Sequence, residues 1–325
     1  MSNVFLTPLL VAQRALATLY NNAVIAALVY RDYDSDFAGQ QGDTVNVRVP
    51  VILAAGEFDR SVGIVIQNAT EDRFPIVLDQ IADVTFSVTS EELLLDIDDF
   101  ATRLLVPAME AINQKIDGDL ADALIAAANQ VPDPSGDYAA MQTGGGVAIS
   151  ADPVEPLKCL VGARVKMGRA KLPTLNRAAV ISPEGAGEAL KGDLIVQANQ
   201  RGDTDGLVEA TIGRKFGFDT FESQVFGDNP ALAGRHIADG VAFHSDAVAL
   251  ATRALQIPLG KLDANGVSVG AAIAQYKGMG LRVIYDYDVN HKQDVVSIDF
   301  LYGLRAVRPQ GAVELDLGVN LGEPS

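Results

Sequence analysis

The sequence is poor in cysteine, tryptophan and histidine. A single cysteine, Cys159, stands among 325 residues, so no disulfide can form within the chain, which predicts a reducing compartment. There is no tryptophan, and the three histidines (His236, His244 and His291) have no metal-ligand spacing to one another or to Cys159. We therefore predict no catalytic residues, no bound metal and no cofactor.

Two motifs that could bind small ligands are incomplete. The glycine-rich run Thr143–Gly146 is followed by Val147 and Ala148, and not by the Lys-Ser/Thr pair with which a phosphate-binding loop ends. The acidic run that begins at Asp286 has His291 where a calcium loop needs glycine, and Ser297 where it needs glutamate. Neither motif predicts a binding site.

Positive charge is scarce as well. Lysine and arginine total 25 against 42 aspartates and glutamates, so the formal net charge is −17. An acidic surface disfavours tight DNA binding over most of the protein, although it allows a protein that encloses DNA. Hydrophobic residues make up 48% of the chain, enough for a sizeable folded core.

The first apolar stretch, Pro8–Tyr30, has the pattern of an amphipathic helix. Thr7 can cap it and Pro8 suits its first position. Its apolar residues recur at three- and four-residue spacing: Leu9, Ala12, Leu16, Leu19 and Ala23. Polar residues interrupt the stretch, so we expect packing on protein and no membrane span, and the first residues do not predict a signal peptide.

A long extended region follows. Val45 and Val47 alternate with polar residues, and a second alternating run covers 81–88. We predict a long hairpin over residues 42–90 with a polar tip at Ala54–Gly63. Because an isolated hairpin is only marginally stable, we expect a neighbouring subunit to cover it, and the same for the N-terminal helix.

Charged residues of both signs lie along this hairpin. Two interpretations fit them equally well. They form a solvated surface, or they make contacts that fix how the hairpin aligns on a neighbouring subunit. The candidates for intersubunit contact are Arg48, Glu57, Asp59, Arg60, Glu71, Asp72 and Arg73.

The longest predicted helix runs over 96–129. Its apolar stripe has four-residue spacing: Phe100, Leu104, Ala108, Ile112, Ile116, Leu120 and Leu124. A helix of this span is roughly 50 Å long, which suits a flat, elongated domain. Pro107 and Gly118 would bend or break it, and we predict them as flex points.

The remainder predicts a mixed α+β region. A second helix is expected over 152–171, with Leu157, Leu160, Val161 and Val165 facing inward. A short helix is expected over 245–254. The predicted strands cover 177–182, 207–212, 216–225, 241–243, 281–287, 295–301 and 304–308.

Several stretches, in their order along the chain, resemble the tailed-bacteriophage major capsid protein of the Hong Kong 97-type fold, in its separately scaffolded coat-protein branch. They are Thr44–Pro50, Ile81–Phe86 with Glu91 and Glu92 behind it, Ala178–Pro183, Gly213–Phe218, Ala242–Ala247, and Asp299–Gly303 followed by Arg308 and Pro309. Together they span most of the chain.

The resemblance implies five regions. They are an N-terminal arm (1–41), an extended loop or E-loop (42–92), a peripheral domain with a spine helix (93–176), an axial domain (177–280), and strands returning to the peripheral domain with a C-terminal tail (281–325). Because the E-loop begins near residue 42, the resemblance also implies a separate scaffolding protein or none.

The function that the resemblance implies is structural. Copies would form pentamers and hexamers that close into an icosahedral shell around double-stranded DNA, which would be enclosed without sequence-specific binding. The other expected partners are a portal protein and a decoration protein, with assembly in the host bacterial cytoplasm and the mature protein in the virion. Two alternatives stay open, an encapsulin-like compartment shell that holds protein cargo and an α/β enzyme.

Overall fold

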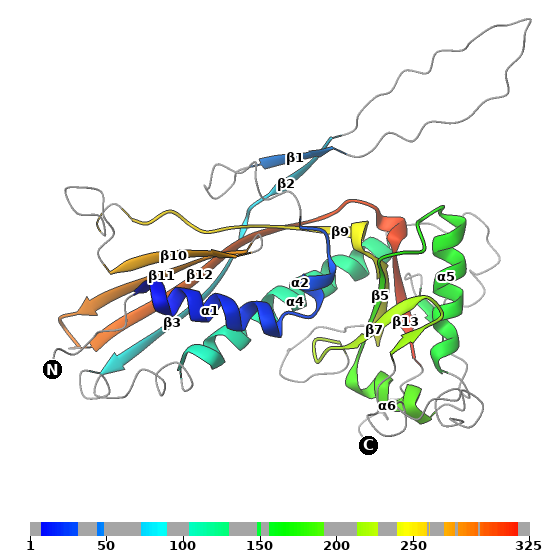
Figure 1. The fold of residues 1–325 in the computed structure, drawn as a ribbon, viewed down its shortest axis with the longest axis horizontal. Coiled ribbons are helices and arrows are strands. Elements are labelled where there is room, and N and C mark those ends of the chain that lie inside the picture. Colours follow the sequence, from blue (N-terminus) through cyan, green and yellow to red (C-terminus); the bar gives the residue numbers. More distant parts are fainter. Residues whose placement is uncertain are drawn as a thin grey trace, which may run out of the picture.

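Two β-sheets and one long helix form the body of the molecule in the computed structural model (Figure 1). The structure describes residues 8–31, 44–48, 73–89, 104–129, 148–150, 156–191, 213–226, 239–258, 260, 270–276, 279–291 and 293–317. The predicted α+β class is confirmed. No helix among these residues is long and apolar enough to span a membrane.

The first sheet is antiparallel and elongated. Its strand order is β10 (Ala271–Tyr276), β11 (Met279–Asp288), β12 (Gln293–Ala306) and β3 (Gln80–Thr89), and β9 (Val248–Arg253) pairs with the second half of β12. We call this set the long sheet. At 14 residues, β12 pairs with three other strands.

Two predictions in this region were wrong. The run predicted as a helix over 245–254 is a 3₁₀ turn, η7 (Ser245–Ala247), followed by strand β9. A strand covered on both faces is apolar at nearly every position, so its period cannot be read from the sequence, and β9 is buried from Val248 to Thr252. The strands predicted separately at 295–301 and 304–308 are one strand, β12, through Ala306.

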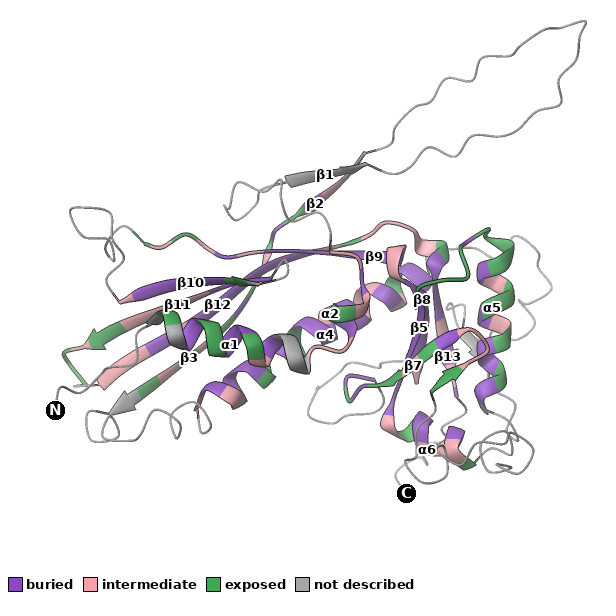
Figure 2. Ribbon diagram, viewed as in Figure 1, coloured by how far each residue is buried: buried purple, intermediate pink, exposed green. Residues whose placement is uncertain are grey.

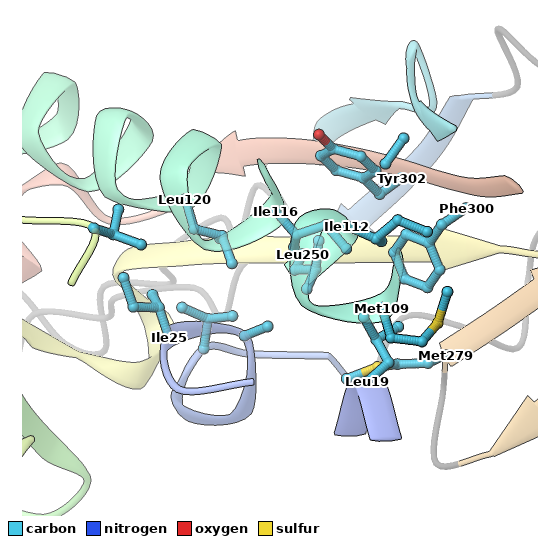
Figure 3. Packing of buried hydrophobic residues seen from close by; sticks show 14 of the residues in the cluster. Leu19, Ile25, Met109, Ile112, Ile116, Leu120, Leu250, Met279, Phe300 and Tyr302 are labelled. Carbon is cyan, nitrogen blue, oxygen red and sulfur yellow. The ribbon is translucent and has the colours of Figure 1, made fainter. Parts of the chain in front are cut away.

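Three helices cover one face of the long sheet. They are α1 (Pro8–Asn22), α2 (Ile25–Leu28) and α4 (Val106–Asn129), which pack with the sheet in one apolar cluster (Figures 1 and 3). Leu19, Met109 and Phe300 lie together in its centre. Residues 96–103 of the predicted long helix lie outside the described residues.

The apolar face of α1 is buried within its own chain. Val11, Ala15 and Leu16 are almost inaccessible to solvent, against α4 and the strands β10 and β11. Our expectation that the N-terminal helix needs a neighbouring subunit to cover it was therefore wrong. Leu9, predicted on the buried stripe, is exposed.

The second sheet is six-stranded and we call it the axial sheet. Its order is β4 (Ala148–Ser150), β13 (Ala312–Asp316), β8 (Gly240–His244), β5 (Arg177–Ile181), β7 (Phe218–Glu222) and β6 (Arg214–Lys215). A 3₁₀ turn, η5 (Pro156–Lys158), leads into α5 (Cys159–Arg169), and α5 and α6 (Pro183–Lys191) cover one face in a second apolar cluster.

The other face of the axial sheet packs on the α4 side. Ala178, Val180 and Phe243 belong to the same cluster as α4, whereas the neighbouring Ala179 and Ile181 face α5 and α6. Figure 2 shows these strands almost wholly buried. The two sheets therefore share α4 as a common support.

Sheet membership does not follow the regions that the resemblance implied. Of the strands predicted to return to the peripheral domain, β11 and β12 lie in the long sheet, but β13 follows the 3₁₀ turn η9 (Pro309–Gly311) into the axial sheet. In the other direction, β9 and β10 come from the stretch predicted as axial and lie in the long sheet.

On α5 the predicted inward stripe is partly wrong. Leu157 and Leu160 are buried as expected, but Val161 and Val165 are 40% and 42% exposed. The buried face is completed by smaller or softer side chains, Ala163 and Met167. Both stripes have helical spacing, so the sequence pattern alone does not choose between them.

Candidate functional site

The described residues contain no group of three or more histidine, cysteine, aspartate or glutamate side chains that could hold a metal ion. Cys159 is buried beneath α5, and burial raises the pKa of its thiol to about 12, so it is a packing residue and not a nucleophile at neutral pH.

The histidines have local structural contacts. His244 is buried at the end of β8, where its Nδ1 accepts a hydrogen bond from the backbone N–H of Asp246 at 3.2 Å. Burial lowers its pKa, so the neutral form that accepts this bond is favoured. His291 lies 2.5 Å from Asp288 in the exposed β11–β12 turn, and His236 lies outside the described residues.

The predicted hairpin is present with its first strand as expected, but its second strand is not the one predicted. β1 (Thr44–Arg48) pairs with β2 (Arg73–Val77) as an antiparallel ribbon, in which Thr44 lies opposite Val77 and Arg48 opposite Arg73. The run at 81–88 is extended as predicted, in β3, but it pairs with β12 and not with the first strand. The returning strand of the hairpin therefore ends at Val77, before β3 begins.

Two of the seven charged candidates lie within described residues. Arg48 and Arg73 face each other across the last described pair of the ribbon. The other five, Glu57, Asp59, Arg60, Glu71 and Asp72, lie outside the described residues. Their role in contacts between subunits stays a prediction.

The base of this ribbon is held on the body by its own small core. Ile76 and Leu78 are fully buried against Ala251 of β9 and Leu301 of β12, on the side of the long sheet away from α4. Figure 1 shows β2 leading directly into β3 as the ribbon leaves the long sheet. The start of the ribbon is therefore fixed by contacts within one subunit.

Gly303 of β12 makes this crossing possible. A Cβ atom at this position would lie 2.1 Å from the carbonyl oxygen of Val77 and 2.8 Å from its carbonyl carbon. Since both are backbone atoms, no side-chain rotation could relieve the overlap. The sequence carried a signal for this contact, because a glycine inside a strand often marks a close approach of another backbone, but we did not predict its role.

The two predicted flex points differ in their surroundings. Pro107 is exposed at the second residue of α4, just after a π-helical turn at Leu104 and Leu105. Proline is tolerated in a first helical turn, so it does not break α4 here. Gly118 is buried in the middle of the helix. No kink follows from these positions, and their flexing stays a prediction.

Asp117, next to Gly118, fixes the chain between α1 and α2. Its buried carboxylate accepts hydrogen bonds from the backbone N–H groups of Val24 and Ala26, at 3.2 and 3.1 Å. Burial raises its pKa from 3.8 to about 6, against the lowering effect of these bonds. A sequence pattern gives no sign of this contact, which joins residues more than 90 positions apart.

A polar pocket of about 400 Å³ opens between α4 and the end of β7. Three carboxylates contribute to its wall, those of Glu110, Asp117 and Glu222. Its remaining lining residues are Val24, Asn113, Gln114, Ser223, Gln224 and Val225. The pocket is therefore suited to a cationic group and poorly suited to an apolar ligand.

Comparisons with known proteins place the fold. No protein-family model matches the sequence, and no curated protein is similar to it. Among solved structures, one from Mycobacterium phage Che8 is similar with a TM-score of 0.61 and 19% identity, covering 91% of this chain and 92% of the other. The capsid structure of cyanophage P-SCSP1u gives 0.60 and 14%, covering 90% and 88%.

A third similarity is to the mature capsid of bacteriophage PhiM1, with a TM-score of 0.57 and 12% identity over 91% of this chain and 87% of the other. The similarity thus extends over nearly all of each subunit, and not over a shared local motif. The chain has the Hong Kong 97-type capsid fold, as predicted from the sequence. These three solved structures all come from bacteriophages.

Proposed function

We propose that this chain is the major capsid (coat) protein of a tailed bacteriophage. Copies assemble into pentamers and hexamers, and these close into the icosahedral shell that encloses double-stranded DNA. The observation that carries the proposal is the fold, which matches three phage structures over about nine-tenths of both chains. The role is structural and not enzymatic.

The shape of the subunit supports this function. The long sheet and α4 make an elongated body, the axial sheet lies at one end of it, and the β1–β2 ribbon leaves it beside β9 (Figure 1). In this proposal residues 42–92 are the E-loop region, in which β3 stays in the long sheet and the ribbon that begins with β1 and returns through β2 lies across the next subunit. Residues 1–41 are the N-terminal arm, α4 is the spine helix, and the axial sheet lies nearest the five-fold and six-fold axes.

The charges of the ribbon would set its register on the neighbour. Arg48 and Arg73 are register partners at the last described pair of the ribbon, and we assign this role to both. We assign the same role to Glu57, Asp59, Arg60, Glu71 and Asp72.

Shell expansion would bend α4 at Pro107 and Gly118. Pro107 has no N–H to donate and follows a π-helical turn, a local irregularity at which helices change direction easily. Gly118 lowers helix propensity by about 1 kcal/mol relative to alanine. Both positions are therefore weak points in an otherwise regular helix.

The partners that we propose besides the chain itself are a portal protein, a separate scaffolding protein and a decoration protein. The DNA is enclosed without sequence-specific binding, which agrees with the formal charge of −17. The shell would assemble in the cytoplasm of the bacterial host and persist in the virion.

The proposal is tested by expressing the chain, with and without a scaffolding protein, and examining the products by negative-stain electron microscopy. Closed shells are expected, with DNA and not protein cargo inside particles from infected cells. If only small, uniform oligomers formed under every condition, the function would be wrong. Protein cargo in place of DNA would indicate an encapsulin-like compartment.

A second experiment addresses the E-loop. Deletion of residues 54–63 shortens the tip while leaving β1 and β2 in place. We expect the variant to fold, as judged by circular dichroism, and to fail to form shells. Shell assembly at the normal yield would count against the assignment of 42–92 as the E-loop.

A further inference from the structure

The outer face of α5 has the composition of an interface. Val161 and Val165 are one helical turn apart and 40% and 42% exposed. Lys158 and Arg169 continue the same stripe at either end of α5 and are also exposed. The face therefore has an apolar centre between two positive ends, an arrangement that a protein partner can bury.

This region is positively charged in an otherwise acidic protein. Residues 156–177 contain six basic residues and no acidic one: Lys158, Arg164, Lys166, Arg169, Lys171 and Arg177. The formal charge of the rest of the chain is therefore −17 − 6 = −23. Of these six, Lys158 and Arg169 lie on the exposed stripe of α5, whereas Arg177 is buried, so a partner of this face is expected to place acidic groups at the two ends of an apolar centre.

The opposite side of the axial sheet offers such a surface. Phe221 of β7 is 39% exposed. It lies across from Val180 of β5, whose side chain faces the α4 side, whereas Phe218 packs toward α5 and α6. The exposed Asp219 lies on the same face as Phe221 and forms an exposed ion pair with Arg214, so the unbalanced negative charge of this surface comes from the carboxylates of the neighbouring pocket.

Beside Phe221 is the polar pocket between α4 and β7. Glu110 and Glu222 are exposed at its wall, and the pocket volume of about 400 Å³ can admit the end of a lysine or arginine side chain. We define the acidic face as Phe221, Asp219 and this pocket, and the basic face as the stripe from Lys158 to Arg169 on α5.

We propose that the basic face of one subunit docks on the acidic face of a second copy, with Val161 and Val165 against Phe221 and a basic side chain of α5 in the carboxylate pocket. The inference rests on the proposed function and specifies one of its contacts. Since the two faces lie on opposite sides of one sheet, the contact is head-to-tail. A head-to-tail contact forms a ring when its rotation closes, as a pentamer or hexamer requires.

Double-stranded DNA fits the basic face less well. Phosphate contacts need positive or polar groups, and the two valines at the centre of the face could not make them. The same valines suit the apolar core of a protein interface. A second copy supplies both acidic groups and an apolar surface, whereas the DNA backbone supplies only the negative charge of its phosphates.

The test uses two double variants of the full chain, one for each face. Val161→Glu with Val165→Glu alters the basic face at exposed helix positions, and Glu110→Gln with Glu222→Gln removes the charge of two carboxylates from the acidic face. Both should fold normally by circular dichroism and urea unfolding, because every altered side chain is exposed. Association is measured by analytical ultracentrifugation.

Each variant alone is expected to lose ring formation. Mixed in equal amounts, they should form a heterodimer and nothing larger, because only one pair of unaltered faces remains between them. As a control, Val289→Glu, at an exposed valine of the β11–β12 turn, is added to both variants and should leave the heterodimer intact.

The possible results distinguish a failure of this contact from a failure of the proposed capsid function. Normal rings or shells from either double variant would overturn the contact while leaving the capsid function in place. A wild-type chain that never associates would overturn both. If the valine variant assembled normally but lost binding to a DNA duplex that the wild type retains, the basic face would be a DNA contact and the inference wrong.

Discussion

At Gly303, the lack of a side chain decides where the ribbon crosses the body. We expect Gly303→Ala to destabilise the subunit by about 1–3 kcal/mol, the usual cost of overpacking. The added Cβ would overlap the Val77 backbone, so β2 must move away from β12. Urea unfolding measures the stability, and electron microscopy tests whether a displaced ribbon still permits shells.

Gly187→Ala provides the matched control. Gly187 lies within α6, and a Cβ atom there would have no neighbour within 4 Å. Alanine should raise helix propensity and leave stability unchanged or higher, by about 0.5–1 kcal/mol. Equal unfolding curves for the two variants would show that the crossing at Gly303 tolerates a methyl group.

Asp117 makes stability depend on pH. In the folded protein its carboxyl keeps a proton up to about pH 6, whereas in the unfolded chain it loses the proton near 3.8. Because the folded state binds more protons between these values, the free energy of unfolding falls as pH rises through this range, by about 3 kcal/mol, and the effect is constant above it.

The variant Asp117→Asn isolates this contribution. Its unfolding free energy, measured from pH 4 to pH 7, should lack the fall of about 3 kcal/mol that Asp117 contributes in the wild type. The difference between the two curves cancels other titrating groups, including His244. A difference curve that stayed flat across the range would mean that the Asp117 carboxylate is charged in the folded protein throughout.

At the scale of elements, a polar row crosses three strands of the long sheet. Arg282 of β11 donates from Nε to Asp299 of β12 at 2.9 Å and from Nη1 to the Gln256 carbonyl at 2.6 Å. Asp83 of β3 lies opposite Asp299, and the Ser297 hydroxyl donates to Asp83 at 3.1 Å. Burial and the neighbouring Asp83 raise the pKa of Asp299, and Arg282 opposes this.

Removing Arg282 should leave the neighbouring carboxylates of Asp299 and Asp83 to repel each other. We expect Arg282→Met to cost about 3 kcal/mol at pH 7.5, because two adjacent carboxylates lose the cation that pairs with one of them. The loss should become smaller as the pH is lowered, because the pKa of Asp299 is raised and protonation removes its charge. Arg214→Met, whose ion pair with Asp219 is exposed, should cost less than about 1 kcal/mol. Similar costs for both variants would contradict the role of the row.

The sequence predicted elements better than it predicted their partners. The spacing in α1 and the alternation in β3 were both read correctly, because each records which side of an element is buried. The pairing of β3 with β12 joins residues more than 200 positions apart, and no local pattern specifies that choice. The helix predicted at 245–254 failed for a related reason, since β9 is buried on both faces.

The candidate site was predictable only in part. The glycine of Asp299–Gly303 was noticed as part of a family resemblance, but its contact with Val77 depends on a crossing that exists only in three dimensions. Val161 and Val165 were assigned to the core because two apolar stripes overlap on α5. The surface that carries our further inference is thus one that the sequence pattern misplaced.

At the scale of the whole molecule, the long sheet depends on contacts between distant parts of the chain. Truncation after residue 292 would remove β12, the partner of β3, β9 and β11, together with β13, which lies between β4 and β8 in the axial sheet. We expect the truncated chain to lack cooperative thermal unfolding by calorimetry. Truncation after residue 317, which keeps every described strand, should retain it. A cooperative transition in the shorter chain would show that neither β12 nor β13 is needed for a folded unit.

The position of β12 near the end of the sequence also bears on the order of synthesis. A ribosome makes the ribbon and α4 long before it makes the strand that holds them in place. The nascent chain therefore cannot complete its long sheet until about residue 306 has left the ribosome, and such distant pairings form slowly. A prematurely ended chain would lack the strand that anchors its ribbon, so in the proposed shell the same strand that organises the subunit would also exclude unfinished copies.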